Sequence, residues 1–165
     1  MCYDFLLNGE KEEVNVHVVE SRNYAGSTIE VNANLGDELT IYKYAAVISS
    51  LNHPKGTFLD ALKKLLSGAK EKGFDSLLQE QAAAWADIWL HSDITIEGDI
   101  SAQQAIRFNI FQLNQTYTGR DERLNIGPKG FTGEKYGGST YWDTEAYCLP
   151  FYMATHGQKV AQQLL

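Results

Sequence analysis

Near residue 53 the apolar residues of this chain change their spacing, from every second position to every third or fourth. Upstream, Val14, Val16 and Val18 alternate with polar residues, which is the period of a half-buried strand. Downstream of Asn52-His53-Pro54, the apolar residues of TFLDALKKLLS (57–67) recur at helical spacing. We therefore expect a sheet region followed by a helical region.

Four strands are predicted in the first third of the chain. The dipeptide Asn8-Gly9 favours a hairpin turn between 5–7 and a strand over 14–20. Two further strands are expected over 27–35 and 38–50, where apolar, β-branched and aromatic residues gather. Antiparallel strands with short links are typical of a sandwich or a meander. A sheet with one apolar face also needs a second sheet or helices to cover it.

Three helices are predicted after residue 53. The first covers 57–67 and is expected to stop at Gly68, and an extended piece over 92–99 precedes the third. The third begins with a capping box of Ser101 and Gln104 and is closed by Gly119. The second carries one apolar stripe: Phe74, Leu77, Leu78, Ala82, Trp85, Ile88 and Trp89.

The third predicted helix has apolar residues on more than one side. Ile106, Ile110 and Tyr117 share one side, whereas Phe108 and Phe111 lie on others. Such a helix needs neighbours on several sides, and this chain offers few. The sequence also begins in an apparent mid-sheet segment and stops in an apparent mid-helix segment. We therefore expect a fragment of a longer protein.

Composition and charge exclude several functions. The chain has 21 acidic and 14 basic residues and a net charge of −7, which disfavours sequence-independent nucleic-acid binding. No apolar run reaches 18 residues, so no membrane-spanning helix is expected, and the start has no signal-peptide pattern. Cys2 and Cys148 make no disulfide framework, which favours reduced thiols and a cytoplasmic protein.

Several catalytic motifs are absent from the sequence. The four histidines share no ligand spacing and no C-x-x-C occurs, so no metal site is predicted. The glycine-rich stretch 127–138 fits neither the P-loop nor the dinucleotide-binding pattern. GGSTY lacks the last glycine of a nucleophile elbow, which argues against Ser139 as a hydrolase nucleophile.

One aromatic and acidic cluster follows the glycine-rich stretch. Trp142 beside Asp143 supplies a flat apolar platform and a carboxylate, the two kinds of group that a sugar requires. A structural interpretation stays open, because Thr140 and Asp143 also form a capping box. On that interpretation a core stripe of Tyr147, Phe151 and Ala154 follows, and Pro150 kinks the helix or divides it in two.

The acidic residues of the chain do not provide a complete set of catalytic groups. Asp143 and Glu145 are two positions apart, so on a helix they point away from each other and are no acid–base pair. Glu97, Asp99 and Glu134 are further candidates, but loop acids are mostly solvated surface residues.

The segment from 105 to 152 resembles the disaccharide phosphorylases of glycoside hydrolase family 65. The family pattern is G-[FL]-[TS]-G-E-x-Y-x-G-x-x-[FY]-W-D-[TS]-E. Ser139-Thr140 and Ala146-Tyr147 favour the branch that acts on maltose over those for trehalose and kojibiose. The matching residues are Gly130, Phe131, Thr132, Gly133, Glu134, Tyr136, Gly138, Tyr141, Trp142, Asp143, Thr144 and Glu145.

This resemblance implies a mixed fold in three parts. Residues 1–52 are expected to end an N-terminal β-sandwich domain, and residues 53–92 to form a helical linker. Residues 93–165 would begin an (α/α)6 catalytic barrel. The family protein is several times longer than this chain, in agreement with the fragment expectation.

The resemblance also implies a site and a reaction. Trp142 and Asp143 would bind the glucosyl unit, and Phe131, Thr132, Gly133 and Glu134 would belong to a loop beside the active-site mouth. The family's chemistry is inverting phosphorolysis of maltose to β-glucose 1-phosphate and glucose, with inorganic phosphate as co-substrate and no organic cofactor or metal.

The general acid of the family lies in a G-P-D-E-like segment downstream of Leu165, so the chain alone is expected to be inactive. The resemblance further implies a homodimeric parent. Alternatives are a trehalose or kojibiose phosphorylase, an α-glucoside hydrolase on the same scaffold, or a non-catalytic carbohydrate-binding module.

Overall fold

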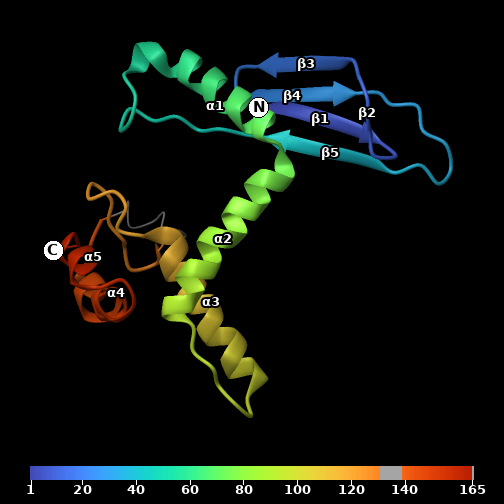
Figure 1. Cartoon of the computed structure of the whole chain (residues 1–165). Coiled ribbons are helices and arrows are strands. Elements are labelled where there is room, and N and C mark those ends of the chain that lie inside the picture. Colours follow the sequence, from blue (N-terminus) through green and yellow to red (C-terminus); the bar gives the residue numbers. More distant parts are fainter. Residues whose placement is uncertain (131–138, 165) are drawn as a thin grey trace. The chain divides into compact units, whose positions relative to one another are not determined.

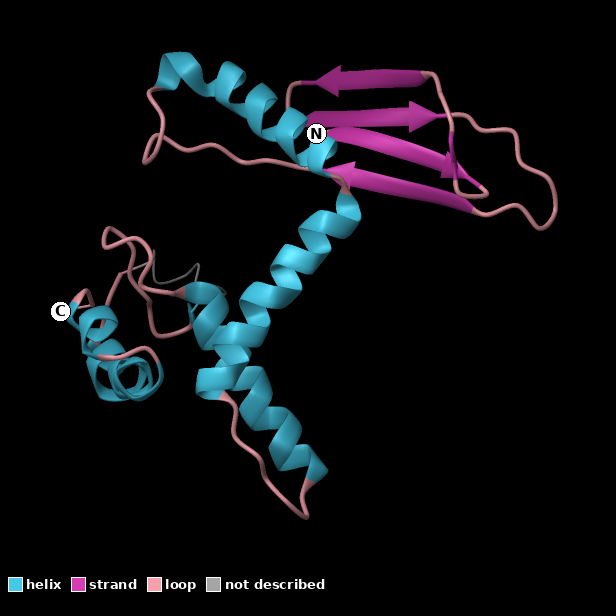
Figure 2. Cartoon of the chain, in the orientation of Figure 1, coloured by secondary structure: helices cyan, strands magenta, loops and turns pink. Residues whose placement is uncertain are grey.

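The computed structural model of the chain describes residues 1–130 and 139–164 (Figure 1). Strands occupy its first part and helices the rest, as predicted (Figure 2). The chain divides into two compact units, Met1–Gln81 and Ala82–Leu165, and helix α2 (Phe74–Ser92) runs through the boundary. The finer predicted division at residues 52 and 92 stays a prediction.

The first unit contains a three-stranded antiparallel sheet in the order β2-β1-β5. It comprises β1 (Cys2–Leu7), β2 (Glu10–Lys11) and β5 (Leu39–Tyr44). The predicted turn at Asn8-Gly9 joins β1 to β2, and both of its residues have positive φ, 53° and 84°. Asn and Gly tolerate these angles better than other residues, which is why this dipeptide marks such hairpins.

The second strand predicted for that hairpin was wrong. The strand expected over 14–20 is β3 (Val16–Ser21), and it pairs with β4 (Tyr24–Ile29) in a separate two-stranded antiparallel sheet. The strand predicted over 27–35 also starts earlier than expected, at Tyr24, and stops at Ile29. The two-residue turn after Ser21 is Arg22-Asn23, and Asn23 is a turn-favouring residue that the prediction did not take into account.

Helix α1 (Phe58–Lys72) follows a short 3-10 turn, η1 (Lys55–Thr57). The predicted stop at Gly68 was wrong, because the helix continues through it to Gly73. Gly73 has a φ of 81° and donates its N–H to the carbonyl of Ala69, 3.1 Å away. A left-handed residue suits glycine and ends a helix, whereas a glycine with helical angles costs only about 1 kcal/mol relative to alanine.

Two residues, Lys70 and Phe74, hold the helices of the first unit against its sheet. The Lys70 ammonium lies 2.8 Å from the Asp4 carboxylate and donates to the carbonyl of Tyr3 at 3.0 Å. The ring of Phe74, the first residue of α2, stacks on Tyr42 of β5 with ring centroids 4.8 Å apart. Helices thus cover part of the three-stranded sheet, as expected for a sheet with one apolar face.

Helix α3 (Ile100–Thr116) begins earlier than predicted, and its capping residue is not Ser101. Asp99 is the N-cap, and its carboxylate accepts the N–H of Ala102 at 2.9 Å. Gln103, rather than the predicted Gln104, bonds the preceding non-helical segment: its amide accepts the N–H of Ile96 and donates to the carbonyl of Ile94, which is not the capping-box bond to the N-cap residue. Asp is as good an N-cap as Ser, so local sequence alone did not separate the two positions.

We expect Asp99→Ala to lower the free energy of unfolding by about 1 kcal/mol, because the N–H of Ala102 loses its partner at the helix start. Ser101→Ala is the matched control and should change it by less than about 0.5 kcal/mol, since Ser101 is exposed in the first turn of α3. Urea unfolding of the 165-residue chain, followed by far-UV circular dichroism, measures both. A larger loss for Ser101→Ala would restore the predicted capping box.

The apolar residues of α3 lie on more than one side of the helix, as expected. Ile110 and Tyr117 are buried, whereas Phe108 and Phe111 are exposed, and Phe111 stacks on Trp85 of α2 with centroids 5.0 Å apart. The helix ends at Thr116, and its C-cap is Tyr117 rather than the expected Gly119. Tyr117 donates its backbone N–H to the carbonyl of Leu113.

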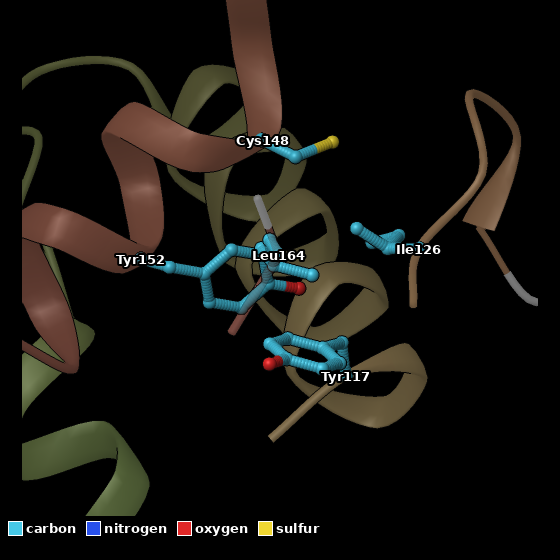
Figure 3. Close-up of a cluster of buried hydrophobic side chains, with 5 residues drawn as sticks. All are labelled: Tyr117, Ile126, Cys148, Tyr152 and Leu164. Atoms are coloured by element: carbon cyan, nitrogen blue, oxygen red, sulfur yellow. The ribbon is translucent and has the colours of Figure 1, made fainter. Parts of the chain in front are cut away.

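The chain continues through a π-helix, η4 (Thr144–Cys148), into α4 (Leu149–Thr155) and α5 (Gln158–Gln162). The main core of the second unit forms beneath these elements. Figure 3 shows five side chains converging there from separate segments. They are Tyr117, Ile126, Cys148, Tyr152 and Leu164, each at most 8% exposed.

Candidate functional site

Trp142 and Asp143 lie at the start of the π-helix, with both side chains exposed. Trp142 is 88% exposed. Their backbone forms a turn in which the N–H of Thr144 bonds the carbonyl of Tyr141 at 2.9 Å. An exposed indole face beside a carboxylate offers stacking to the C–H face of a sugar and acceptors for its hydroxyls.

An open cavity of about 500 Å³ lies at this position. It is lined by Thr140, Tyr141, Trp142 and Glu145. Its volume is within the range of small-molecule sites, and its wall combines two aromatic rings, a hydroxyl and a carboxylate. The arrangement can therefore accept a polar ring with an apolar face.

The π-helix has a local cause in the sequence. Pro150 has no N–H, and in a regular helix its ring would clash with the carbonyl four residues earlier, that of Ala146. The chain widens here, so the N–H of Leu149 bonds the carbonyl of Thr144, five residues earlier. Pro150 was predicted to kink the helix or to divide it in two; η4 in fact continues into α4 without a break, and Pro150 lies in the first turn of α4, where the π geometry gives way to α geometry.

Beneath the exposed Trp142-Asp143 pair, the helix buries one stripe at a spacing of four residues. Thr144 and Tyr152 are fully buried and Cys148 nearly so. Of the alternative core stripe of Tyr147, Phe151 and Ala154, only Phe151 packs partly buried against the core, whereas Tyr147 is 75% exposed and Ala154 is exposed too.

Tyr152 connects the stripe to helix α3. Its hydroxyl donates to the carbonyl of Leu113 at 2.9 Å, and its ring meets Tyr117 edge to face with centroids 5.2 Å apart. Burial raises the pKa of Tyr152 well above its usual value of 10, and the nearby Cys148 and Tyr117 add to the rise. The phenol is therefore a neutral structural donor and does not act as a base.

A second cavity, of about 520 Å³, lies between α3 and the segment 126–130. Its wall includes Asn109 and Gln112 of α3 and Tyr147 of η4, together with the buried Cys148. Burial, followed by the negative charge of Asp143, raises the pKa of the Cys148 thiol. A neutral thiol is a poor nucleophile, which disfavours a nucleophilic role for Cys148 in this cavity.

Of the six predicted site residues, Trp142 and Asp143 are adjacent in the sequence and both exposed; Trp142 lines the cavity of about 500 Å³, and Asp143 is not among the residues that line it. The loop residues Phe131, Thr132, Gly133 and Glu134 lie outside the described residues. The expected capping role of Asp143 was wrong: its side chain makes no capping hydrogen bond to the π-helix that follows. Its carboxylate thus stays exposed for another partner.

Sequence reasoning missed the part played by Thr144, which matched the family pattern without an assigned role. Its hydroxyl donates to the carbonyl of Ile126 at 2.8 Å, across 18 residues of sequence. The spacing of Thr144, Cys148 and Tyr152 at every fourth position is a signal that could have identified this buried stripe.

Two further properties concern residues 1–130 and 139–164. No three histidine, cysteine or acidic side chains gather there in a way that could hold a metal ion. No helix in the same ranges is long and apolar enough to span a membrane.

Comparison with known proteins identifies both parts of the chain. Residues 1–88 match the N-terminal domain of glycosyl hydrolase family 65, and residues 107–165 match the central catalytic domain of the same family. The sheets thus fall in the N-terminal domain, and α3 with the helices after it falls largely in the catalytic domain. This confirms the predicted fold class.

Individual relatives agree with the family match. Maltose phosphorylase of Bacillus subtilis is 42% identical over 97% of this chain and 21% of its own length. Kojibiose phosphorylase of Caldanaerobacter subterraneus is 35% identical over 77% of this chain and 16% of its own length. α,α-Trehalose phosphorylase of Thermoanaerobacter brockii is 34% identical over the same share of this chain and 16% of its own.

A solved structure shows the same fold. A putative kojibiose phosphorylase from the human microbiome superimposes with a TM-score of 0.65 and 26% identity, over 98% of this chain and 21% of that one. The chain spans about a fifth of the length of the relatives it matches. With both domain matches in the family's order along the sequence, the chain belongs to glycosyl hydrolase family 65.

Proposed function

We propose that this chain is part of an inverting disaccharide phosphorylase that acts on maltose. The observation that carries the proposal is the 42% identity to a maltose phosphorylase along nearly the whole chain. The exposed Trp142-Asp143 pair beside a cavity of suitable size supports it, because a glucosyl unit needs both groups.

In the proposed reaction, maltose binds with its non-reducing glucosyl unit against Trp142 and Asp143. The indole stacks on the apolar face of the sugar, and the carboxylate accepts hydrogen bonds from its hydroxyls. A carboxylic acid outside residues 1–165 protonates the glycosidic oxygen. A phosphate oxygen attacks the anomeric carbon from the opposite face, the glycosidic bond breaks, and β-glucose 1-phosphate and glucose leave.

Phosphate takes the place of the activated water of an inverting hydrolase, so the proposed reaction needs only one catalytic carboxyl group. No metal or organic cofactor is proposed. The loop of Phe131, Thr132, Gly133 and Glu134 is proposed to border the same site, and a homodimeric parent in the cytoplasm stays a prediction.

Kojibiose is the second candidate substrate, because a kojibiose phosphorylase is similar in sequence and a putative one is similar in structure. The substituted sugar hydroxyl differs between these disaccharides, whereas the glucosyl unit is the same. Trp142 and Asp143, proposed to bind that unit, therefore do not distinguish the two substrates.

The test uses the full-length protein that carries residues 1–165, incubated with maltose in the presence and absence of inorganic phosphate. We expect β-glucose 1-phosphate and glucose in equal amounts, and only with phosphate. Kojibiose and trehalose at the same concentration are the substrate controls. Glucose released without phosphate would show that the protein is a hydrolase. If kojibiose is converted and maltose is not, kojibiose is the substrate. The isolated 165-residue chain should give no product.

A further inference from the structure

Thr144 lies between exposed neighbours and is itself fully buried. Asp143 and Glu145 on either side of it are exposed, whereas Thr144 has no exposed surface. Its hydroxyl donates to the carbonyl of Ile126, a residue that is only 1% exposed. Water has little access to replace this hydrogen bond, so the bond joins the start of the π-helix to a segment 18 residues away.

The same segment also meets the chain on the other side of Trp142 and Asp143. A methyl group added at Gly127 would lie 3.1 Å from the backbone carbonyl of Ser139. Consecutive residues, Ile126 and Gly127, therefore contact the chain both before and after the exposed pair. The backbone that carries Trp142 and Asp143 thus has a hydrogen bond to this segment after the pair and a close approach to it before the pair.

The exposed side chains themselves give little restraint. Trp142 is 88% exposed, and the carboxylate of Asp143 makes no capping bond to η4. Their direction therefore depends on the backbone from Tyr141 to Thr144. Catalytic sites tolerate little error in such directions, because a displacement of about 1 Å can cost about 100-fold in rate.

We infer that Thr144 is a positioning residue for the sugar site, acting through its hydrogen bond to Ile126 on the direction of Trp142 and Asp143. This inference rests on the proposed function of that site. It assigns to Thr144 no contact with substrate. It makes the hydroxyl, and not the volume of the side chain, the property that matters.

The test compares Thr144→Val with Thr144→Ser in the full-length protein. Valine keeps the shape and removes the hydroxyl, whereas serine keeps the hydroxyl and removes a methyl group. We expect Thr144→Val to raise the KM for maltose and to lower kcat/KM about 10- to 100-fold. The KM for phosphate should stay within about twofold, and Thr144→Ser should stay within about threefold of the wild type in all constants.

Ser92→Ala is the matched control, since Ser92 is also buried and its hydroxyl also donates to a backbone carbonyl, that of Ile88 at 2.7 Å. Its kinetic constants should not change. Equal losses in Ser92→Ala and Thr144→Val would reduce the role of Thr144 to general stability and overturn the inference. Wild-type kinetics in Thr144→Val would overturn it too, while leaving the proposed function intact.

A second measurement separates this inference from the function itself. Amide hydrogen exchange reports the bond from Thr144 N–H to Tyr141 whether or not the protein phosphorolyses maltose. We expect Thr144→Val to raise exchange at residue 144 at least about 10-fold, and Thr144→Ser to leave it unchanged. If the wild type makes no glucose 1-phosphate, the proposed function fails. Whatever the activity, an unchanged exchange rate at residue 144 in Thr144→Val overturns the positioning role.

Discussion

Asp143→Asn in the full-length protein is expected to lower kcat/KM for maltose phosphorolysis about 100-fold. Asparagine has the same size and keeps one acceptor oxygen, but it loses the charge and replaces the other oxygen with a donor. Hydrogen bonds to a charged group contribute about 1.5–3 kcal/mol, and 1.4 kcal/mol corresponds to a factor of ten. The measurement is steady-state formation of β-glucose 1-phosphate.

The fold should not change in this variant. Asp143 is exposed and makes no capping bond to the π-helix, so the free energy of unfolding should stay within about 0.5 kcal/mol. Glu97→Gln is the control, because Glu97 is an exposed loop acid in the same unit, and its kinetics should match the wild type. Unchanged kinetics in Asp143→Asn would remove Asp143 from the sugar site.

Tyr152→Ala is expected to destabilise the 165-residue chain by about 3–5 kcal/mol, the range for truncation of a large buried aromatic residue. Tyr152 is fully buried and its ring meets that of Tyr117, so alanine leaves a cavity in the main core of the second unit. Urea unfolding followed by far-UV circular dichroism measures the loss. A change below about 1 kcal/mol would show that this core is not the main source of stability.

Tyr152→Phe separates the ring from its hydroxyl. We expect a loss of only about 1 kcal/mol, because the carbonyl of Leu113 keeps the N–H of Tyr117 as a second donor at 3.1 Å. A loss as large as that of alanine would mean that the hydroxyl, and not the ring, holds α4 against α3.

The raised pKa of Tyr152 gives the same pair of variants a pH dependence. Burial favours the protonated phenol in the folded state, so its stabilising effect is complete below the unfolded pKa of 10 and is lost as the pH rises above it. Tyr152→Phe should therefore lose stability less steeply above pH 10 than the wild type. Equal slopes would contradict the buried, neutral phenol.

Local sequence predicted the elements better than their partners. The change of period near residue 53 fixed the order of strands and helices, and Asn8-Gly9 fixed a hairpin turn. The pairing of β3 with β4 was not predicted, because Asn23 in the turn after Ser21 lacks the following glycine that marked the first hairpin. Strand pairing depends on contacts between distant residues, which period alone does not specify.

Helix ends show the same limit at single residues. Gly68 and Gly73 are five positions apart and either can end a helix, but only Gly73 adopts the left-handed φ of 81°. Asp99 and Ser101 are both good caps, and the amide of Gln103 on the preceding segment accompanies the earlier start. At α3 an interaction with the preceding segment accompanies the choice between two locally acceptable ends, whereas at α1 the backbone angle of Gly73 marks the end.

For the site, the sequence by itself determined the residue types, the aromatic–acidic pair and the family pattern, and it placed Pro150 where the helix must widen. Only the tertiary structure decided which helical face is buried. Two stripes, one through Tyr147 and one through Thr144, fit the same segment. The hydroxyl of Thr144 donates to the carbonyl of Ile126, which lies 18 residues away in the sequence. The hydroxyl of Tyr152 donates to the carbonyl of Leu113, 39 residues away. Buried polar groups require such partners, and a partner far along the chain is set by the fold and not by local sequence.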